Sequence, residues 1–82
     1  MLYTRDQIRR KVTEVLANKL NIAEDSITLD SSLVDDLGID SFGAMEMIFD
    51  LEETYDIEIQ DEEAATFIRV ADIVGYMEQK MN

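Results

Sequence analysis

The chain opens with a helical pattern of apolar residues. Thr4 is followed three residues later by Gln7, which is the pattern of a capping box at the start of a helix. Apolar side chains then recur at spacings of three and four residues, which places them on one helix face: Ile8, Val12, Val15, Leu16 and Leu20. The sequence therefore predicts an amphipathic helix from about residue 5 to residue 20 or 21.

Residues 21–40 show no sustained period. Their apolar residues are scattered among Ser, Asp and Gly: Ile22, Ile27, Leu29, Leu33, Leu37 and Ile39. A connection of this length is unusual in a small domain unless it is functional or is pinned to the core by its apolar side chains. We expect a long loop in which both conditions hold.

A second helix is predicted from Ser41 to Tyr55. Asp40 precedes it, and a carboxylate at that position suits both the cap and the helix dipole. At about 100° per residue, one side of this helix carries an ordinary core stripe made of Ala44, Met47, Ile48, Leu51 and Tyr55. A second apolar stripe lies on the opposite side and consists of Phe42, Met45 and Phe49.

The last third of the chain predicts two further helices. Residues 55–59 alternate like a strand, but a lone strand has no ladder partner, so we expect an extended linker. Asp61 is expected to cap a short third helix through Ala65, and residues 70–81 carry a final apolar stripe of Val70, Ile73, Val74, Met77 and Met81. The predicted fold class is all-α: a single domain over residues 1–82, built as a four-helix bundle with a long loop between helices one and two and a short third helix.

Composition narrows the function. The 82 residues include no Cys and no His, which excludes a thiol or imidazole nucleophile, a disulfide, and thiolate or imidazole metal ligands. The chain is therefore not expected to be an enzyme. Nineteen acidic against seven basic residues give a formal charge of −12, which repels nucleic acid and anionic lipid and attracts basic protein surfaces. With no apolar run long enough to span a membrane and no secretory signal, we expect a cytoplasmic protein. The strong net charge favours a monomer.

The second apolar stripe has two interpretations. Phe42, Met45 and Phe49 alternate with Glu46 and Glu53, so an exposed stripe would be a docking surface in an acidic field. The acidic side chains, Asp50 among them, also suit a simply solvated face. Alternatively, the two phenylalanines pack beneath the long loop as a satellite of the core. Periodicity alone leaves both open.

Ser41 stands where the long loop meets the second helix. A hydroxyl there should be exposed, and a helix N-terminus accommodates a phosphate ester well, although a simple helix cap is the alternative. The spacing Gly38-x-x-Ser41-x-Gly43 has one residue too many for a nucleophile elbow. A calcium loop also fails, because neither register of the glycines supplies the acidic ligands at the first and last positions.

Three segments resemble the acyl carrier protein family: Asp35-Asp36-Leu37-Gly38-Ile39-Asp40-Ser41, Leu51-Glu52-Glu53-Thr54-Tyr55-Asp56-Ile57-Glu58-Ile59 and Asp61-Glu62-Glu63-Ala64. The likeness covers essentially the whole chain. It implies a four-helix bundle with 4′-phosphopantetheine attached to Ser41, next to Asp40. The arm would supply the thiol that a chain without Cys lacks, and acyl groups would be held on it as thioesters.

The same resemblance implies partners and a partner-facing second helix. The partners would be a phosphopantetheinyl transferase and acyl-loading and acyl-processing enzymes with basic docking surfaces. The expected docking residues are Asp36, Phe42, Met45, Glu46, Phe49 and Glu53. The carrier would serve fatty acid, polyketide or specialised lipid synthesis.

Three positions depart from the family pattern. Phe42 replaces the usual Leu, Gly43 stands at a position that is often acidic, and Gln60 replaces a common Pro. The run Asp40-Ser41-Phe42-Gly43 is also similar to carriers of D-alanine, whereas the rest of the chain is similar to fatty acid and polyketide carriers. We expect a specialised acyl carrier. The alternatives are a D-alanyl or other aminoacyl carrier, and an acidic interaction module that is never modified.

Overall fold

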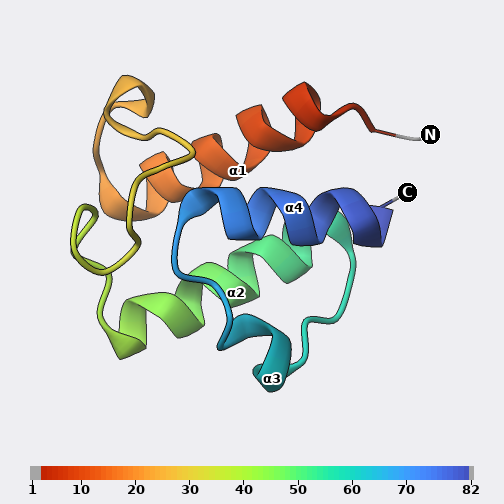
Figure 1. The fold of residues 1–82 in the computed structure, drawn as a ribbon. Helices are drawn as coiled ribbons and strands as arrows, with labels where there is room; N and C mark the ends of the chain where they lie inside the picture. Colours follow the sequence, from red (N-terminus) through yellow and green to blue (C-terminus); the bar gives the residue numbers. More distant parts are fainter. Residues whose placement is uncertain (1–2, 82) are drawn as a thin grey trace.

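The computed structural model describes residues 3–81, and in this part of the chain the fold is helical, as predicted (Figure 1). Four α-helices follow one another: α1 (Arg5–Leu20), α2 (Ser41–Tyr55), α3 (Asp61–Ala64) and α4 (Val70–Met81). One 3₁₀ turn, η1 (Glu24–Ser26), follows α1. The described residues contain no strand, only an isolated antiparallel bridge between Ser32 and Arg69.

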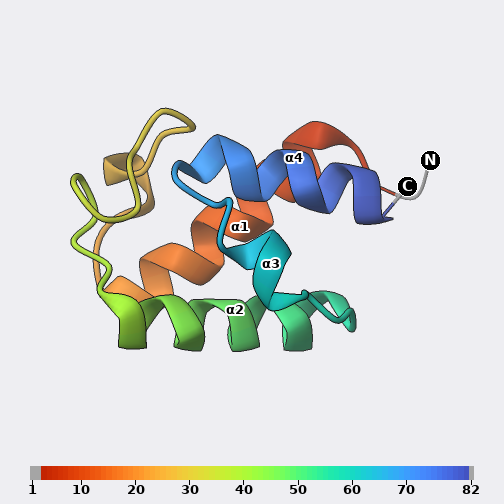
Figure 2. The same ribbon diagram turned by 60° about the horizontal axis from the view of Figure 1, so that its bottom comes forward.

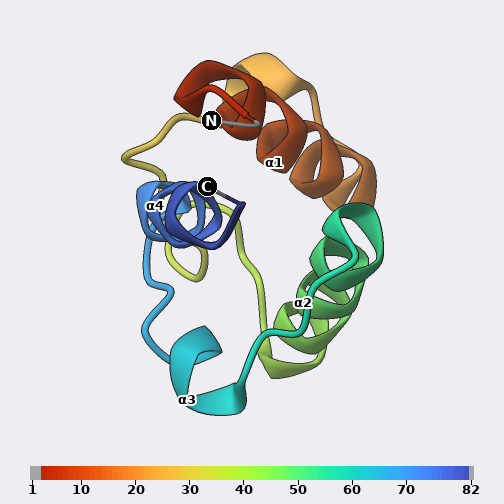
Figure 3. The same cartoon turned by 90° about the vertical axis from the view of Figure 1, so that its right-hand side faces the viewer.

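The core lies between α1, α2 and α4. α1 packs against both other long helices, and Figure 3 shows these three helices at three corners, with α3 between α2 and α4 at the remaining side. The innermost side chains are fully buried and come from the predicted stripes: Ile8, Val12, Leu16, Met47, Leu51, Val70, Ile73, Val74 and Met77. Burial of each such side chain contributes about 1.5–3 kcal/mol, and these contributions are the main stabilising term of the bundle.

Local signals set the ends of α1. The capping box is present: the Gln7 backbone N–H donates to Thr4 Oγ1 at 3.1 Å, and the Thr4 N–H donates to Gln7 Oε1 at 2.9 Å. The helix ends where Asn21 adopts a left-handed conformation with φ of 58°. Asn is one of the few residues besides Gly that tolerates this conformation, so Asn21 stops the helix in place of a glycine.

The long loop is pinned, as predicted, and Figure 2 shows it beside the start of α4. Its buried anchors are Ile27, Leu33 and Ile39. Hydrogen bonds also tie the loop to the segment before α4. The Leu33 N–H donates to the Ile68 carbonyl at 2.9 Å, and the Arg69 side chain donates to the Asp30 carbonyl at 2.6 Å. These bonds satisfy backbone groups that have no helix or sheet partner.

The third helix begins differently from the prediction. Gln60, and not Asp61, is the N-cap, and Asp61 is the first helical residue. Gln60 has the extended backbone of a cap, with φ of −71° and ψ of 149°, and its N–H donates to the carboxylate of Glu63 at 3.2 Å. The reciprocal bond from the third helical residue therefore decides the helix start. The helix ends at Ala64, with Ala65 as the C-cap, one residue earlier than expected.

A carboxylate also organises the start of α4. Asp72 accepts hydrogen bonds from the backbone N–H groups of Arg69 at 2.9 Å and Ile68 at 3.0 Å. These two bonds, the one from Arg69 first, lower the pKa of the Asp72 carboxyl.

Among residues 3–81, no helix has the length and apolar character that a membrane span requires.

Candidate functional site

Ser41 is the first residue of α2, and its side chain is exposed. The helix is capped by its neighbour: the Gly43 N–H donates to Asp40 Oδ1 at 2.7 Å. The interpretation of Ser41 as a helix cap is therefore wrong, because Asp40 already fills that role. The serine hydroxyl forms no hydrogen bond within the described residues.

The first turn of α2 offers donors beside this hydroxyl. Gly43 and Ala44 donate their N–H groups to Asp40, but those of Ser41 and Phe42 have no hydrogen-bond partner among residues 3–81. Such orphan donors and the helix dipole favour an anion at this end. A phosphate ester on Ser41 Oγ would therefore meet a favourable environment, so the residues present fit a phosphopantetheine group.

The end of the loop holds this junction in place. Gly38 adopts φ of 69°, a conformation that glycine reaches without strain, and its N–H donates to the Val34 carbonyl at 3.0 Å. Immediately afterwards Ile39 enters the core with 5% of its surface exposed, and its N–H donates to the Leu33 carbonyl at 2.9 Å. A tight turn and a buried anchor thus precede the cap, and they fix where α2 starts.

The second apolar stripe lies on the surface. Phe42 is 69% exposed, Met45 59% and Phe49 60%. The alternative, in which the phenylalanines pack beneath the long loop, is wrong, because that loop bonds to the segment before α4 instead. We call Phe42, Met45 and Phe49 the docking stripe. Their exposure leaves this stripe without a covering element in the described fold.

Acidic residues border the docking stripe on one side. Glu46, Asp50 and Glu53 lie three and four residues apart on α2, and we call them the acidic flank. Asp36 lies outside α2, in the long loop, and its place on the docking face stays a prediction. Its carboxylate accepts a hydrogen bond of 2.7 Å from the Ser32 N–H and stabilises a turn of the long loop. No described contact joins Asp36 to the stripe.

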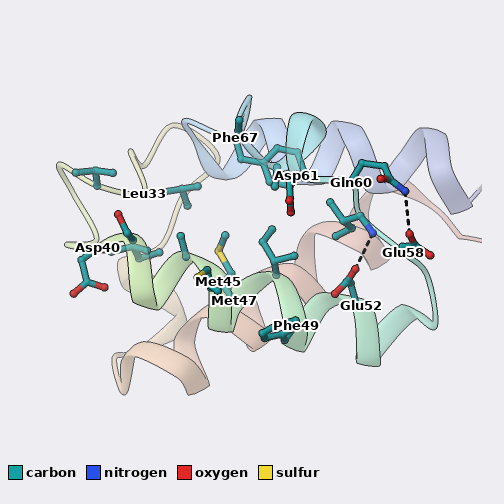
Figure 4. Close-up of a pocket in the computed structure, with 18 residues that line it drawn as sticks. Leu33, Asp40, Met45, Met47, Phe49, Glu52, Glu58, Gln60, Asp61 and Phe67 are labelled. Atoms are coloured by element: carbon teal, nitrogen blue, oxygen red, sulfur yellow. Dashed lines mark hydrogen bonds between the residues drawn. The ribbon is translucent and has the colours of Figure 1, made fainter.

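A groove of about 860 Å³ runs between α2 and the segment that contains α3 (Figure 4). Ser41 lines the groove. Figure 4 labels its neighbour Asp40, together with Leu33, toward one end, and Glu52 and Glu58 toward the other. Most of the wall is apolar and comes from the loop, from α2 and from the α3 segment: Leu33, Val34, Ile39, Ala44, Met45, Met47, Ile48, Phe49, Ile59, Ala64, Ala65 and Phe67. Of the predicted core stripe of α2, Ala44, Met47 and Ile48 line the groove, whereas Leu51 is fully buried and does not.

A few specific contacts hold the α3 wall. The Ile59 N–H donates to Glu52 Oε2 at 2.8 Å, and the Tyr76 hydroxyl donates to Glu63 Oε1 at 3.0 Å. The ring of Phe67 meets the Tyr76 ring edge to face, with 5.4 Å between centroids. Desolvation, followed by the hydrogen bond to Glu63, raises the pKa of Tyr76 to about 12.

One cation reaches the acidic flank from another helix. Lys19 Nζ in α1 lies 3.0 Å from Asp50 Oδ2 in α2. The hydrogen bond to Asp50 raises the pKa of the Lys19 ammonium, and the charge of Glu46 acts in the same direction. No sequence pattern predicts this pair, because residues 19 and 50 lie in different helices and their contact depends on how α1 packs against α2.

Sequence reasoning also missed most of the groove wall. Val34 belongs to an irregular loop and Phe67 to a connection, so no periodicity marked either residue. Ile59 offered one sequence signal, because it ends the alternating run of residues 55–59. In the structure it is buried, with 5% of its surface exposed.

Comparisons with known proteins agree with this geometry. A family model described as "Phosphopantetheine attachment site" matches residues 10–77. An "Acyl carrier protein" of Exiguobacterium sp. (strain ATCC BAA-1283 / AT1b) is 45% identical over 78 residues, covering 95% of this chain and 99% of that protein. Proteins of the same name from Clostridium perfringens (strain SM101 / Type A) and Akkermansia muciniphila are 46% and 38% identical, covering 82% and 90% of this chain and 88% and 92% of theirs.

The family model specifies the cofactor, because phosphopantetheine is the group that its attachment site carries. The relatives are named as carriers and not as enzymes, in agreement with the prediction from composition. A match over residues 10–77, together with relatives of nearly equal length, shows that this chain belongs to the acyl carrier protein family.

Proposed function

We propose that Ser41 is the residue that carries the 4′-phosphopantetheine arm, and that the chain presents acyl groups on this arm to biosynthetic enzymes. The observation that carries the proposal is the exposed Ser41 residue, whose hydroxyl has no hydrogen-bond partner among the described residues and which lines a mainly apolar groove. No Cys is present, so the thiol has to come from the arm.

The residues around Ser41 have separate roles in this proposal. The Ser41 Oγ takes the phosphate of the arm, and the N–H groups of Ser41 and Phe42 stabilise its negative charge. Asp40 keeps α2 capped, so the helix start stays ordered while the serine is modified. When attached, the arm supplies the thiol that holds an acyl group as a thioester.

The groove supports an acyl cargo over a D-alanyl cargo. Its walls are mainly apolar, and Met47 can change rotamer to fit a guest. A short aminoacyl group gains little from such a wall. We infer a specialised acyl carrier of fatty acid, polyketide or specialised lipid synthesis. An arm loaded with a medium-length acyl chain should raise the melting temperature above that of the unloaded holo form, and a D-alanyl group should not. Equal melting temperatures would count against an acyl cargo sheltered in the groove.

The docking stripe and the acidic flank support partners with a basic, apolar surface, including the transferase that attaches the arm. The stripe contributes contact area, and the flank attracts cations on the partner. We further infer that residues 1–82 act as one carrier domain in the cytoplasm. We expect this domain to be a monomer, because the net charge of −12 opposes self-association.

The proposal is tested by intact mass after incubation with coenzyme A and a broad-specificity phosphopantetheinyl transferase. We expect the mass to rise by one phosphopantetheine group, and peptide mapping should place that group on Ser41. A folded protein whose mass does not change would favour the unmodified interaction module. Modification at another serine would contradict the proposed site.

A further inference from the structure

We propose that Lys19 is an intramolecular counter-ion of the acidic flank, which occupies Asp50 and thereby limits how strongly a basic partner is attracted to α2. The inference rests on the docking surface of the proposed function. It adds a residue of α1 that tunes partner specificity without belonging to the docking stripe.

The geometry places Lys19 against the middle of the acidic flank. Its ammonium is 3.0 Å from the Asp50 carboxylate. Lys19, Asp50 and Glu53 line the same shallow cleft between α1 and α2, together with Val15, Asn18 and Thr54. Asp50 follows Glu46 by four residues and precedes Glu53 by three, so the cation lies beside the centre of the negative row.

Lys19 differs from the other cations of α1 in what it pairs with. Arg9 and Arg10 pair with Asp6, and Lys11 pairs with Glu14, within α1 itself, while Arg5 pairs with Glu78 of α4. Lys19 instead pairs with a residue of the helix that carries the docking stripe. A partner cation that approaches Asp50 therefore has to displace Lys19 or be repelled by it, whereas Glu46 and Glu53 have no ion pair within residues 3–81.

The Lys19–Asp50 pair is partly exposed, so a cation of the partner can compete with Lys19 for Asp50. The side chain of Lys19 is 28% exposed and that of Asp50 38%. Ion pairs at such exposure are weak and sensitive to salt, so an incoming guanidinium or ammonium can exchange with Lys19. Charges at the edge of an interface act mainly on the association rate and on its salt dependence.

The test compares Lys19→Met with Lys11→Met as substrates of the transferase, at low and at physiological ionic strength. Both variants lose one positive charge and one ion pair from α1, so they have the same net charge, and circular dichroism checks that each keeps its fold. We expect Lys19→Met to raise kcat/KM for arm attachment by about two- to five-fold at low salt, with a steeper salt dependence. Lys11→Met should remain close to wild type, and Lys19→Arg should restore the wild-type rate.

Two results would overturn the inference. Equal acceleration in both methionine variants would reduce the effect to net charge, and slower attachment in Lys19→Met would make Lys19 a direct contact of the partner. Glu46→Gln in the same assay separates this inference from the proposed function. If arm attachment proceeds and Glu46→Gln slows it, only the role of Lys19 is at stake. If Glu46→Gln leaves the rate unchanged, the acidic flank itself is removed from the docking surface, and the role of Lys19 falls with it.

Discussion

The carboxylate of Glu52 accepts a hydrogen bond of 2.8 Å from the backbone N–H of Ile59, seven residues further along the chain. This bond links the last turn of α2 to the segment that leads into α3, and both residues line the groove. Ile59 is 5% exposed, so its N–H has little access to water. Glu52 therefore sets the position of the far groove wall.

Glu52→Ala should leave that N–H without a partner. An unsatisfied buried donor costs about 1–3 kcal/mol, and for a domain of this size each 1 kcal/mol lowers the melting temperature by about 4–8 °C. Denaturant unfolding measures the loss, and hydrogen exchange should accelerate in residues 57–65. Glu53→Ala is the matched control, because it removes the same charge from an exposed neighbour with no described hydrogen bond. Equal losses in both variants would show that charge, and not the bond, matters.

The helices could be predicted from the sequence, because each carries a local signal. Thr4 with Gln7 marks the start of α1, and Asp40 marks the start of α2. The start of α3 was misplaced by one residue because Asp61 is a good cap by residue type, while the deciding bond comes from Glu63. Side-chain preference gives the kind of cap but not which of two neighbouring residues adopts the extended backbone.

The sequence predicted only those features of the candidate site that belong to α2 and the loop before it. The position of Ser41 at the start of α2 follows from the loop before it, its role is implied by the family resemblance, and the exposed stripe was one of two alternatives that the periodicity of α2 left open. The groove wall at Ile59 and Phe67, and the pair of Lys19 with Asp50, come from segments distant in sequence. Their contacts depend on how the helices pack, which no local pattern records.

Tyr76 should make the protein sensitive to high pH. Its folded pKa of about 12 lies above the ordinary value near 10, so the folded state binds the phenolic proton more tightly than the unfolded state does. The resulting stability is fully present below about pH 10 and is lost as the pH rises toward 12. Tyr76→Phe should cost about 1 kcal/mol at neutral pH through the lost hydrogen bond and should show a smaller additional loss between these pH values. Unfolding free energies measured from pH 8 to 12 test this.

Ionisation of other groups also changes the unfolding free energy at high pH, so the informative quantity is the difference between wild type and Tyr76→Phe. Burial raises the pKa of Tyr55, and Tyr55→Phe therefore serves as the matched control. Parallel curves for wild type and Tyr76→Phe would show that the Glu63 contact does not hold the proton.

The docking stripe should matter for partners and not for folding. Phe49 is 60% exposed, so Phe49→Ser should change the unfolding free energy by less than about 0.5 kcal/mol. The kcat/KM of arm attachment should fall about ten-fold, because a large side chain at the centre of an interface contributes more than 1 kcal/mol. Steady-state kinetics with the transferase measure the loss.

Ile22→Ser is the control for that experiment. Ile22 is also an exposed apolar residue, at 38%, but it follows α1 and lies outside the docking stripe. A similar fall in both variants would indicate a general effect of surface hydrophobicity. An unchanged rate in Phe49→Ser would remove this residue from the docking surface.

The most direct test of the central claim compares the intact masses of wild type, Ser41→Ala and Ser26→Ala after incubation with the transferase and coenzyme A. Ser26 is also exposed and also lies at a helical turn, so it controls for the loss of a surface hydroxyl. We predict that wild type and Ser26→Ala each gain one phosphopantetheine group, while Ser41→Ala keeps its fold and gains none. A phosphopantetheine group on Ser41→Ala would contradict the account.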